Sequence, residues 1–130
     1  MLKFAIVGFG GLAKVHFGNI EAVKKSHPDI ECVAICDVNP DAFTASAELN
    51  IGSVEAYDLS AYRLYTSPEE LFENEELDFI ISAIPTFEHS RVAVMALNKG
   101  IHVFSEKPMA RSLEQAKEMI DAAKKNNLTL

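Results

Sequence analysis

The sequence predicts an α/β fold in which helices cover both faces of a doubly wound parallel sheet. Short apolar runs rich in Val, Ile and Phe alternate with segments of helical pattern, and Gly or Pro lies near most of the boundaries. Strands that are apolar on both faces are typical of parallel sheets, which are buried on both sides. The alternation of strand and helix also predicts right-handed crossovers between parallel neighbours.

Five strands are expected from these apolar runs. They are Lys3–Val7, Ile30–Cys36, Phe79–Ala83, Ile101–Phe104 and the weaker Arg63–Tyr65. Five helices are expected between and after them, and several begin with a capping residue or a proline. They run from Gly11 to Lys25, from Asn39-Pro40, from Ser67-Pro68, from Glu88 to Lys99 and from Ser112. Residues 51–62 match neither pattern, so we expect a loop or a short helical piece there.

Composition limits the class of protein. The chain has 130 residues, which fits one domain, and its 48% hydrophobic and 24% charged residues are typical of a folded globular protein. The net charge of −7 argues against general nucleic-acid binding, because an acidic domain repels phosphate backbones.

No apolar run reaches the roughly 18 residues that span a membrane. Cys32 and Cys36 lie too far apart in an extended strand to bridge without a bend, so we expect reduced thiols in a cytoplasmic protein.

A glycine-rich turn lies between the first predicted strand and the first predicted helix. Residues 8–13 read GFGGLA and match the pattern G-x-G-x-x-A. Gly8 allows the tight turn, Gly10 lets the backbone approach a phosphate, and the first N–H groups of the helix point at the anion. In this context the pattern predicts that a dinucleotide binds at Gly8, Phe9, Gly10, Gly11 and Leu12. A plain turn without a ligand is the alternative, and the glycines also argue against a signal peptide at the apolar start of the chain.

Asp37 directly follows the second predicted strand, 29 positions after Gly8. A carboxylate there would accept hydrogen bonds from the ribose hydroxyls of a dinucleotide. The usual separation is about 20 residues, so a long first crossover is expected. No Lys or Arg follows in residues 38–40, and a carboxylate repels a 2′-phosphate, so we expect NAD in preference to NADP. A structural turn residue is the alternative role for Asp37.

His16 lies at the centre of the apolar arc of the first predicted helix. It could contact the cofactor or a loop at the carboxyl edge of the sheet. The favoured interpretation is a core histidine that hydrogen-bonds to the backbone.

Two further segments follow predicted strands: AIPTFEH at residues 83–89 and FSEKPM at residues 104–109. The carboxyl ends of parallel strands meet at the edge where open α/β sheets bind ligands. With its glycine turn, its Pro85 and His89, and its Glu106-Lys107-Pro108, the chain resembles the N-terminal domain of the Gfo/Idh/MocA oxidoreductases. This family is named for glucose–fructose oxidoreductase and inositol dehydrogenase. The resemblance covers the whole chain, and ALNKGIHVFSEKP at residues 96–108 closely matches the approach to the family's Glu-Lys-Pro signature.

The resemblance implies a Rossmann fold and hydride transfer between NAD, or NADP, and a hydroxyl-bearing carbon of a sugar, cyclitol or related small molecule. Lys107 would be the active-site lysine, and burial or cationic surroundings would have to lower its pKa for it to act as a base at neutral pH. Glu106 would orient Lys107 or touch the cofactor. His89 would support the nicotinamide-side loop, with a purely structural role at the helix start as its alternative. Ile84 and Pro85 would line the cofactor, and no metal site is expected.

The resemblance also implies that residues 1–130 are the first third of a longer enzyme, followed by an α+β substrate-binding domain and the sheet that forms a homo-oligomer. Residues 128–130 look like the opening of a strand. We therefore expect a fragment that folds, binds dinucleotide weakly and does not turn over. A cis bond between Lys107 and Pro108, as in some relatives with this signature, is a further hypothesis.

Two competing functions remain: a non-catalytic NAD(P)-sensing regulator and an S-adenosylmethionine-binding protein. The presence of Glu106-Lys107-Pro108 argues against both.

Overall fold

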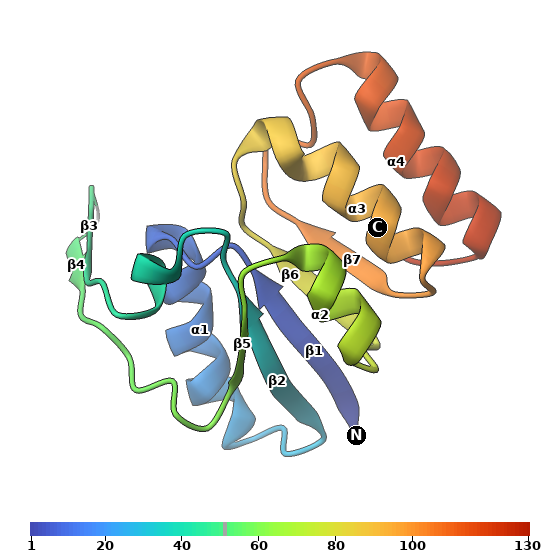
Figure 1. Ribbon diagram of the computed structural model, residues 1–130. Helices are drawn as coiled ribbons and strands as arrows, with labels where there is room; N and C mark the ends of the chain where they lie inside the picture. Colours follow the sequence, from blue (N-terminus) through green and yellow to red (C-terminus); the bar gives the residue numbers. More distant parts are fainter. Residues whose placement is uncertain (51) are drawn as a thin grey trace.

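The computed structural model describes residues 1–50 and 52–130. Its centre is a five-stranded sheet in which every neighbouring pair is parallel. The strands are β1 (Leu2–Val7), β2 (Ile30–Cys36), β5 (Arg63–Tyr65), β6 (Phe79–Ser82) and β7 (His102–Ser105), in the order β5-β2-β1-β6-β7 (Figure 1). The order starts at β1 in the centre and grows outwards in both directions, so the predicted doubly wound sheet is confirmed.

Helices cover both faces of this sheet (Figure 1). The helices are α1 (Gly11–Lys24), α2 (Pro68–Asn74), α3 (His89–Asn98) and α4 (Leu113–Asn126). Helix α1 packs on one face, while α2 and α3 pack on the other and α4 lies against α3. The alternation of side chains along β1 shows why both faces need a cover, since Ala5 and Val7 join one buried cluster and Phe4 and Ile6 join the other.

The ends of the helices follow the capping residues of the sequence. The hydroxyl of Ser67 accepts the N–H of Glu70 at the start of α2, and the hydroxyl of Ser112 accepts the N–H of Gln115 at the start of α4. Helix α3 is preceded by the short 3₁₀ turn η2 (Thr86–Glu88). Gly100, with φ +86°, follows α3 as the C-terminal glycine signal predicts.

The expected helix at Asn39-Pro40 is wrong in extent. Only the single 3₁₀ turn η1 (Pro40–Phe43) forms, capped by the side chain of Asn39, and a small hairpin of β3 (Ala47–Leu49) and β4 (Gly52–Val54) follows it. Strand β4 also corrects the expectation of a loop or helical piece over residues 51–62, of which residue 51 lies outside the described residues.

A buried lysine supplies donors to two carbonyl oxygens in and just after the turn η1. The ammonium of Lys14 donates hydrogen bonds to the carbonyl oxygens of Ala42 and Ala45. In a longer α-helix these carbonyls would accept N–H groups from residues four positions further along the chain. Because Lys14 already supplies donors to them, the chain can turn away into the hairpin without leaving these oxygens unpaired.

The two cysteines are free, as expected from the sequence, and the structure shows that both are buried. Burial raises the pKa of the Cys32 thiol to about 12, and burial together with nearby carboxylates, first that of Asp37, raises the pKa of Cys36 to about 12. Both thiols are therefore protonated and unreactive at neutral pH.

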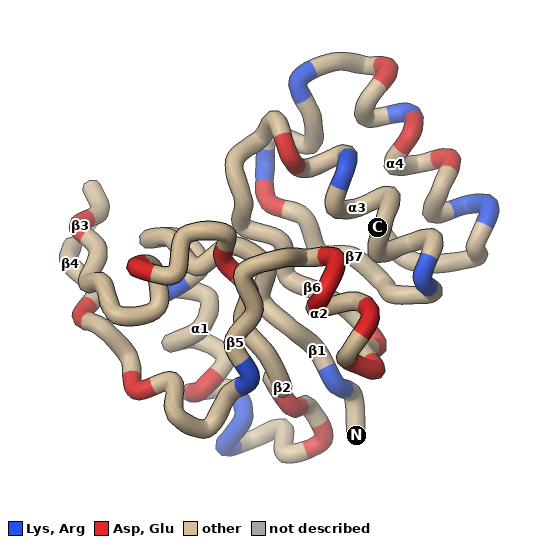
Figure 2. The backbone as a smooth tube through the Cα atoms, viewed as in Figure 1, with Lys and Arg blue, Asp and Glu red and all other residues tan. Residues whose placement is uncertain are grey.

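Charge is unevenly distributed over the surface. Figure 2 shows acidic residues along α2, whereas α4 carries residues of both signs. Among the described residues, no helix is long and apolar enough to cross a membrane.

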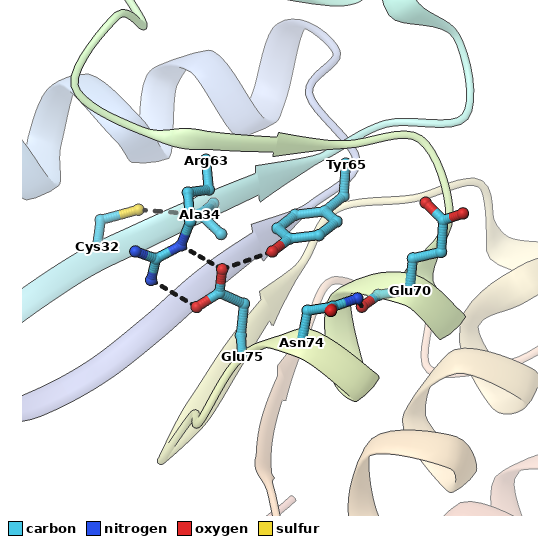
Figure 3. Close-up of polar contacts among 7 residues, drawn as sticks. All are labelled: Cys32, Ala34, Arg63, Tyr65, Glu70, Asn74 and Glu75. Carbon is cyan, nitrogen blue, oxygen red and sulfur yellow. Dashed lines mark hydrogen bonds and ion pairs between the residues drawn. The ribbon is translucent and has the colours of Figure 1, made fainter.

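A polar cluster joins the edge strand β5 to the end of α2 (Figure 3). Arg63 donates two hydrogen bonds to the carboxylate of Glu75, and the hydroxyl of Tyr65 donates to the same carboxylate at 2.6 Å. The side chain of Glu75 is only 5% exposed, whereas that of Arg63 is 62% exposed. Burial opposes the ionisation of Glu75, but the hydrogen bonds from Arg63 and Tyr65 outweigh it and hold the pKa of Glu75 below its usual range.

This cluster makes the stability of the domain depend on pH. Because the folded-state pKa of Glu75 is depressed, its contribution is present at neutral pH and is lost as the pH falls through that pKa. We predict that Arg63→Ala lowers the free energy of unfolding at pH 7 by about 1 to 2 kcal/mol, with a smaller loss below roughly pH 4. Urea unfolding at both pH values measures this, with the exposed Arg111→Ala as the control. An equal loss at both pH values would contradict the prediction.

Candidate functional site

The residues that follow the central strands meet at one edge of the sheet. The N–H of Gly8, after β1, donates to the carbonyl of Cys36 at 2.8 Å, and the N–H of Ala83, after β6, donates to that of Val7 at 2.8 Å. The N–H of Glu106, after β7, donates to the carbonyl of Ser82 at 3.0 Å. These bonds continue the parallel ladder beyond the strands, so the three loops start at the same level.

The glycine turn contains glycines with two different requirements. Gly8 has φ +85°, and a Cβ atom there would lie 2.7 Å from the carbonyl oxygen of Ala83, so the fold itself requires glycine. Gly10 has φ −76° and ψ −169°, which any residue can adopt, and a Cβ atom there would meet nothing within 4 Å. Nothing in the described chain therefore requires glycine at position 10, and the open space in front of it is free for a ligand.

Asp37 connects the end of β2 to the glycine turn. Its Oδ2 accepts the N–H of Phe9 at 2.7 Å and its Oδ1 accepts the N–H of Asn39 at 2.8 Å. Each carboxylate oxygen has a further lone pair, so the group can still accept hydrogen bonds from a ligand hydroxyl. The carboxylate is thus held by the backbone on both oxygens at the mouth of the glycine turn.

A cavity of about 530 Å³ lies in front of these groups. The sequence-predicted residues that line it are Gly8, Gly10, Asp37, Ile84 and Pro85. Further lining comes from apolar residues of neighbouring loops, including Val38 and Phe87, and from Arg91 of α3. The volume lies within the roughly 300 to 1,000 Å³ that small-molecule sites occupy. The cavity therefore combines an apolar lining with a carboxylate and the amino end of α1.

Other sequence-predicted residues lie near this cavity without lining it. The side chain of Phe9 is fully buried in the core beneath α1, and its N–H is used by Asp37. Gly11 faces the hairpin, since a Cβ atom there would lie 2.5 Å from Cδ2 of Leu49. Leu12 is 42% exposed on α1. These residues form the turn and the first helical turn behind the cavity.

His89 joins two loops of the edge. Its ring is 1% exposed, with Nδ1 lying 2.9 Å from the carbonyl oxygen of Pro108 and Nε2 lying 2.8 Å from that of Ile84. The ring therefore contacts the loop after β6 and the loop after β7 at the same time. The sequence left a supporting and a structural role open, and the contacts show that the side chain holds these loops together.

His16 contradicts its favoured interpretation as a core histidine bonded to the backbone. Its side chain is 24% exposed, and its Nε2 lies 2.5 Å from Oε1 of Glu106. The hydrogen bond from His16 is the main cause that holds the pKa of Glu106 below its usual range, and the N–H of Lys107 also contributes. The contact joins helix α1 to the loop after β7, which is the less favoured alternative for this residue.

Lys107 lies in the loop after β7, at the same edge of the sheet as the glycine turn. Its side chain is exposed, and the peptide bond between Lys107 and Pro108 is cis, as hypothesised from the sequence. Glu106 and Lys107 line a second hollow of about 240 Å³, together with Ser105, Met109 and Leu130. The Lys107 side chain is exposed in the part of the chain that the structure describes. These residues therefore do not provide the burial that is expected around a lysine that acts as a base.

Two residues near the site were not predicted from the sequence. Arg91 lines the 530 Å³ cavity and is paired with Glu88 and Glu69. Lys14 is 2% exposed beneath the loop that follows Asp37. The sequence contains one signal for this burial. Lys14 lies beside Ala13 and three residues before Phe17, which places it on the buried side of α1.

A larger hollow of about 940 Å³ lies elsewhere, between α1 and the strands β6 and β7. Its lining is mainly apolar and includes Ile20, Val23, Phe79, Ile81 and Phe104, the last of which is 57% exposed. No residue of the glycine turn lines it. Residues 128–130 run beside it, where the N–H of Val103 donates to the carbonyl of Thr129 at 3.0 Å. Size alone therefore does not identify the functional cavity.

The fold and this edge define an NAD-binding Rossmann domain of an oxidoreductase. A family model described as an oxidoreductase family with an NAD-binding Rossmann fold matches residues 2–130. The chain belongs to this family, the Gfo/Idh/MocA oxidoreductases, as its resemblance implied.

Several of the similar proteins are named dehydrogenases. The inositol 2-dehydrogenase of Salmonella typhimurium is 31% identical over 125 residues, which are 96% of this chain and 34% of that protein. The glucose-6-phosphate 3-dehydrogenase of Bacillus subtilis is 33% identical over 125 residues, which are 96% of this chain and 31% of that protein. The crystal structure of the WlbA dehydrogenase from Bordetella pertussis with NADH and UDP-GlcNAcA has a TM-score of 0.80 and 31% identity, covering 98% of this chain and 35% of that one. The chain thus spans about a third of the length of these relatives.

The two glycines give a sharp test of the site. We predict that Gly10→Ala changes the free energy of unfolding by less than about 0.5 kcal/mol but weakens NADH binding by about tenfold or more, because the new methyl group enters the open space before the helix. Fluorescence titration with NADH and urea unfolding measure the two effects. The matched Gly8→Ala, two positions away, should instead destabilise the fold by about 1 to 3 kcal/mol, because of its positive φ and its contact with Ala83. Unchanged NADH affinity in Gly10→Ala would count against the site.

Proposed function

We propose that this chain is the cofactor-binding domain of a dehydrogenase that transfers a hydride between NAD and a hydroxyl-bearing carbon of a sugar, cyclitol or related molecule. The observation that carries the proposal is the 530 Å³ cavity in which an unfilled Gly10, the amino end of α1 and the carboxylate of Asp37 face one space. Anionic, ribose-bearing ligands match these groups because helix amino ends favour phosphate and carboxylates accept ribose hydroxyls.

The proposed placement of the cofactor follows the edge of the sheet. The N–H groups of residues 10–13 would hold the pyrophosphate, since the first N–H groups of a helix lack partners within it. Asp37 would accept the adenosine ribose hydroxyls, and Ile84 and Pro85 would border the cofactor on the side of β6. When bound, the nicotinamide supplies the carbon that accepts or releases the hydride.

The charges of the cavity favour NAD over NADP in this proposal. A 2′-phosphate next to the ribose would meet the carboxylate of Asp37. Arg91 is the cationic residue that lines the cavity, and its guanidinium is already held by Glu88 at 2.6 Å and by Glu69 at 2.5 Å. A phosphate would have to compete with both carboxylates for this cation, so it gains little from it.

Lys107 is the proposed acid–base residue. It lies on the loop after β7, tied through Glu106 to His16 and through Pro108 to His89. Its ammonium would hydrogen-bond the reacting oxygen of the substrate and take part in proton transfer. Since the side chain is exposed here, the cover that excludes water would come from the part of the relatives that lies outside the matched third.

The remaining parts of the proposal rest on the relatives. Their names give inositol and a sugar phosphate as substrates, which supports a small polyhydroxylated molecule. Residues 1–130 would form the NAD(P)-binding domain, and a following domain would bind the substrate and form a homo-oligomer. The cytoplasm is the proposed location, consistent with the two free, buried thiols.

Removal of the Asp37 carboxylate should change the choice of cofactor. We predict that Asp37→Ala weakens NADH binding by about tenfold and NADPH binding by less, because the repulsion of a 2′-phosphate disappears with the hydrogen-bond acceptor. Titration of the 130-residue chain with both reduced cofactors measures this, with Asp41→Ala, in the turn η1, as the control. Tighter binding of NADPH than NADH by the unsubstituted chain would overturn the preference.

Removal of the Lys107 ammonium should separate chemistry from cofactor binding. In a protein that also carries the remaining two thirds of the relatives' length, Lys107→Ala is expected to lower kcat by about a hundredfold or more, because proton transfer loses its positioned group. The dissociation constant of NADH should stay within about twofold, since the pyrophosphate and ribose contacts lie elsewhere. The exposed Lys99→Ala serves as control. Near-normal turnover of inositol and glucose derivatives by Lys107→Ala would remove this residue from the proposed mechanism.

A further inference from the structure

Lys14 is a buried cation that the proposed chemistry does not use. It lies in the first turns of α1, and its side chain is 2% exposed. The ammonium donates to the carbonyl oxygen of Ala42 at 2.9 Å and to that of Ala45, and it lies 5.3 Å from the centre of the Phe9 ring. A buried ammonium is unfavourable unless it is hydrogen-bonded, so these contacts fix the position of both partners.

The partners of Lys14 belong to the segment that starts at Asp37. This segment begins at Asp37, whose carboxylate accepts hydrogen bonds from the N–H groups of Phe9 and Asn39. It continues through the turn η1 and ends at Ala45. Its two ends are therefore attached to the same region of the molecule, the glycine turn and the first turns of α1. Burial lowers the pKa of Lys14, while the nearby Asp37 carboxylate acts in the opposite direction.

The segment is also one wall of the proposed adenosine site, because Asp37 and Val38 line the 530 Å³ cavity. The segment is too short to build a stable helix, and η1 contains no buried residue. Ala42 and Phe43 pack only partly buried against the core cluster beneath α1, so polar contacts add to this limited apolar packing in holding the segment in place. Lys14 supplies two of these polar contacts, to the carbonyl oxygens of Ala42 and Ala45, and does not itself line the cavity.

We propose that Lys14 is a positioning residue for the adenosine half of the cofactor: its buried ammonium holds residues 37–45 against α1, so that Asp37 and Val38 are in place before the dinucleotide binds. This inference rests on the proposed NAD-binding function. A wall that is already ordered loses little conformational entropy on binding, and this raises affinity without any direct contact between Lys14 and the ligand.

The test compares ligands and variants in the 130-residue chain. Lys14→Met keeps the length and apolar stem of the side chain but removes its donors, so the affinity for ADP-ribose should fall by about tenfold. Lys14→Arg keeps the charge and the donors, and it should restore the affinity to within about threefold. Lys25→Met, at the other end of α1, removes the same charge from an exposed position and should have no effect. Calorimetry with ADP-ribose well below the melting temperature gives these affinities.

Amide hydrogen exchange adds a local readout that a general loss of stability would not produce. In Lys14→Met, exchange should accelerate at residues 39–46 and remain unchanged in β1 and β6. Unchanged ADP-ribose affinity, or equal acceleration throughout the sheet, would overturn the proposal. If the unsubstituted chain fails to bind both NADH and ADP-ribose, the proposed cofactor site itself is wrong, and this outcome is distinct from the failure of Lys14 alone.

A labelling experiment on the unsubstituted chain covers the case in which Lys14→Met does not fold. ADP-ribose should slow the acetylation of Lys14 by about fivefold or more, because a bound ligand suppresses opening of the segment above it. Acetylation of Lys25 should be unaffected. Equal rates at Lys14 with and without ADP-ribose, at concentrations that saturate binding, would contradict the proposal.

Discussion

Parallel pairing of β1 with β2 on one side and with β6 on the other is the constraint on which the site depends. In a parallel sheet all carboxyl ends meet at one edge, and here the pairs Val7–Cys36 and Val7–Ser82 end in register. The hydrogen bonds of Gly8 and Ala83 extend this register by one residue on each side. The glycine turn, Asp37 and the loop after β6 can face one cavity only because the strands end level with one another.

Polar side chains then hold the loops at this edge. Loops leave backbone carbonyls outside the regular ladder, and buried carbonyls need hydrogen-bonding partners. Three side chains serve three loops here: Lys14 binds the segment after β2, His89 contacts the loops after β6 and β7, and Glu106 joins the loop after β7 to His16 of α1. The site is consequently a set of loops attached to one another and to α1.

Much of the fold was accessible from the sequence, because the strands of a doubly wound sheet are apolar on both faces and Gly, Ser and Pro indicate the helix ends. The five strands of the central sheet and the helices after Ser67 and Ser112 were located in this way. The helix expected at Asn39 is only one 3₁₀ turn long, and the donors for the carbonyls of Ala42 and Ala45 come from Lys14, 28 and 31 residues earlier, a contact that no local pattern contains.

The site was accessible to a similar degree. The glycine pattern, Asp37 and the loop at Pro85 were found because each has a fixed place relative to a strand, and the structure brings them to one cavity. The partners of His16 and His89 could not be predicted, since they depend on the spatial neighbours of a side chain rather than on its own position. Glu106, for instance, is 90 residues from His16.

Amide chemical-shift mapping of the ¹⁵N-labelled 130-residue chain with NADH tests most directly whether the glycine-turn edge is the cofactor site. If it is, the largest changes fall on residues 8–13, on residues 37–39 and on Ala83 and Ile84, which surround the 530 Å³ cavity. Changes concentrated instead around Val23 and Phe104, in the larger apolar hollow beside α1, with the glycine turn unaffected, would contradict this assignment.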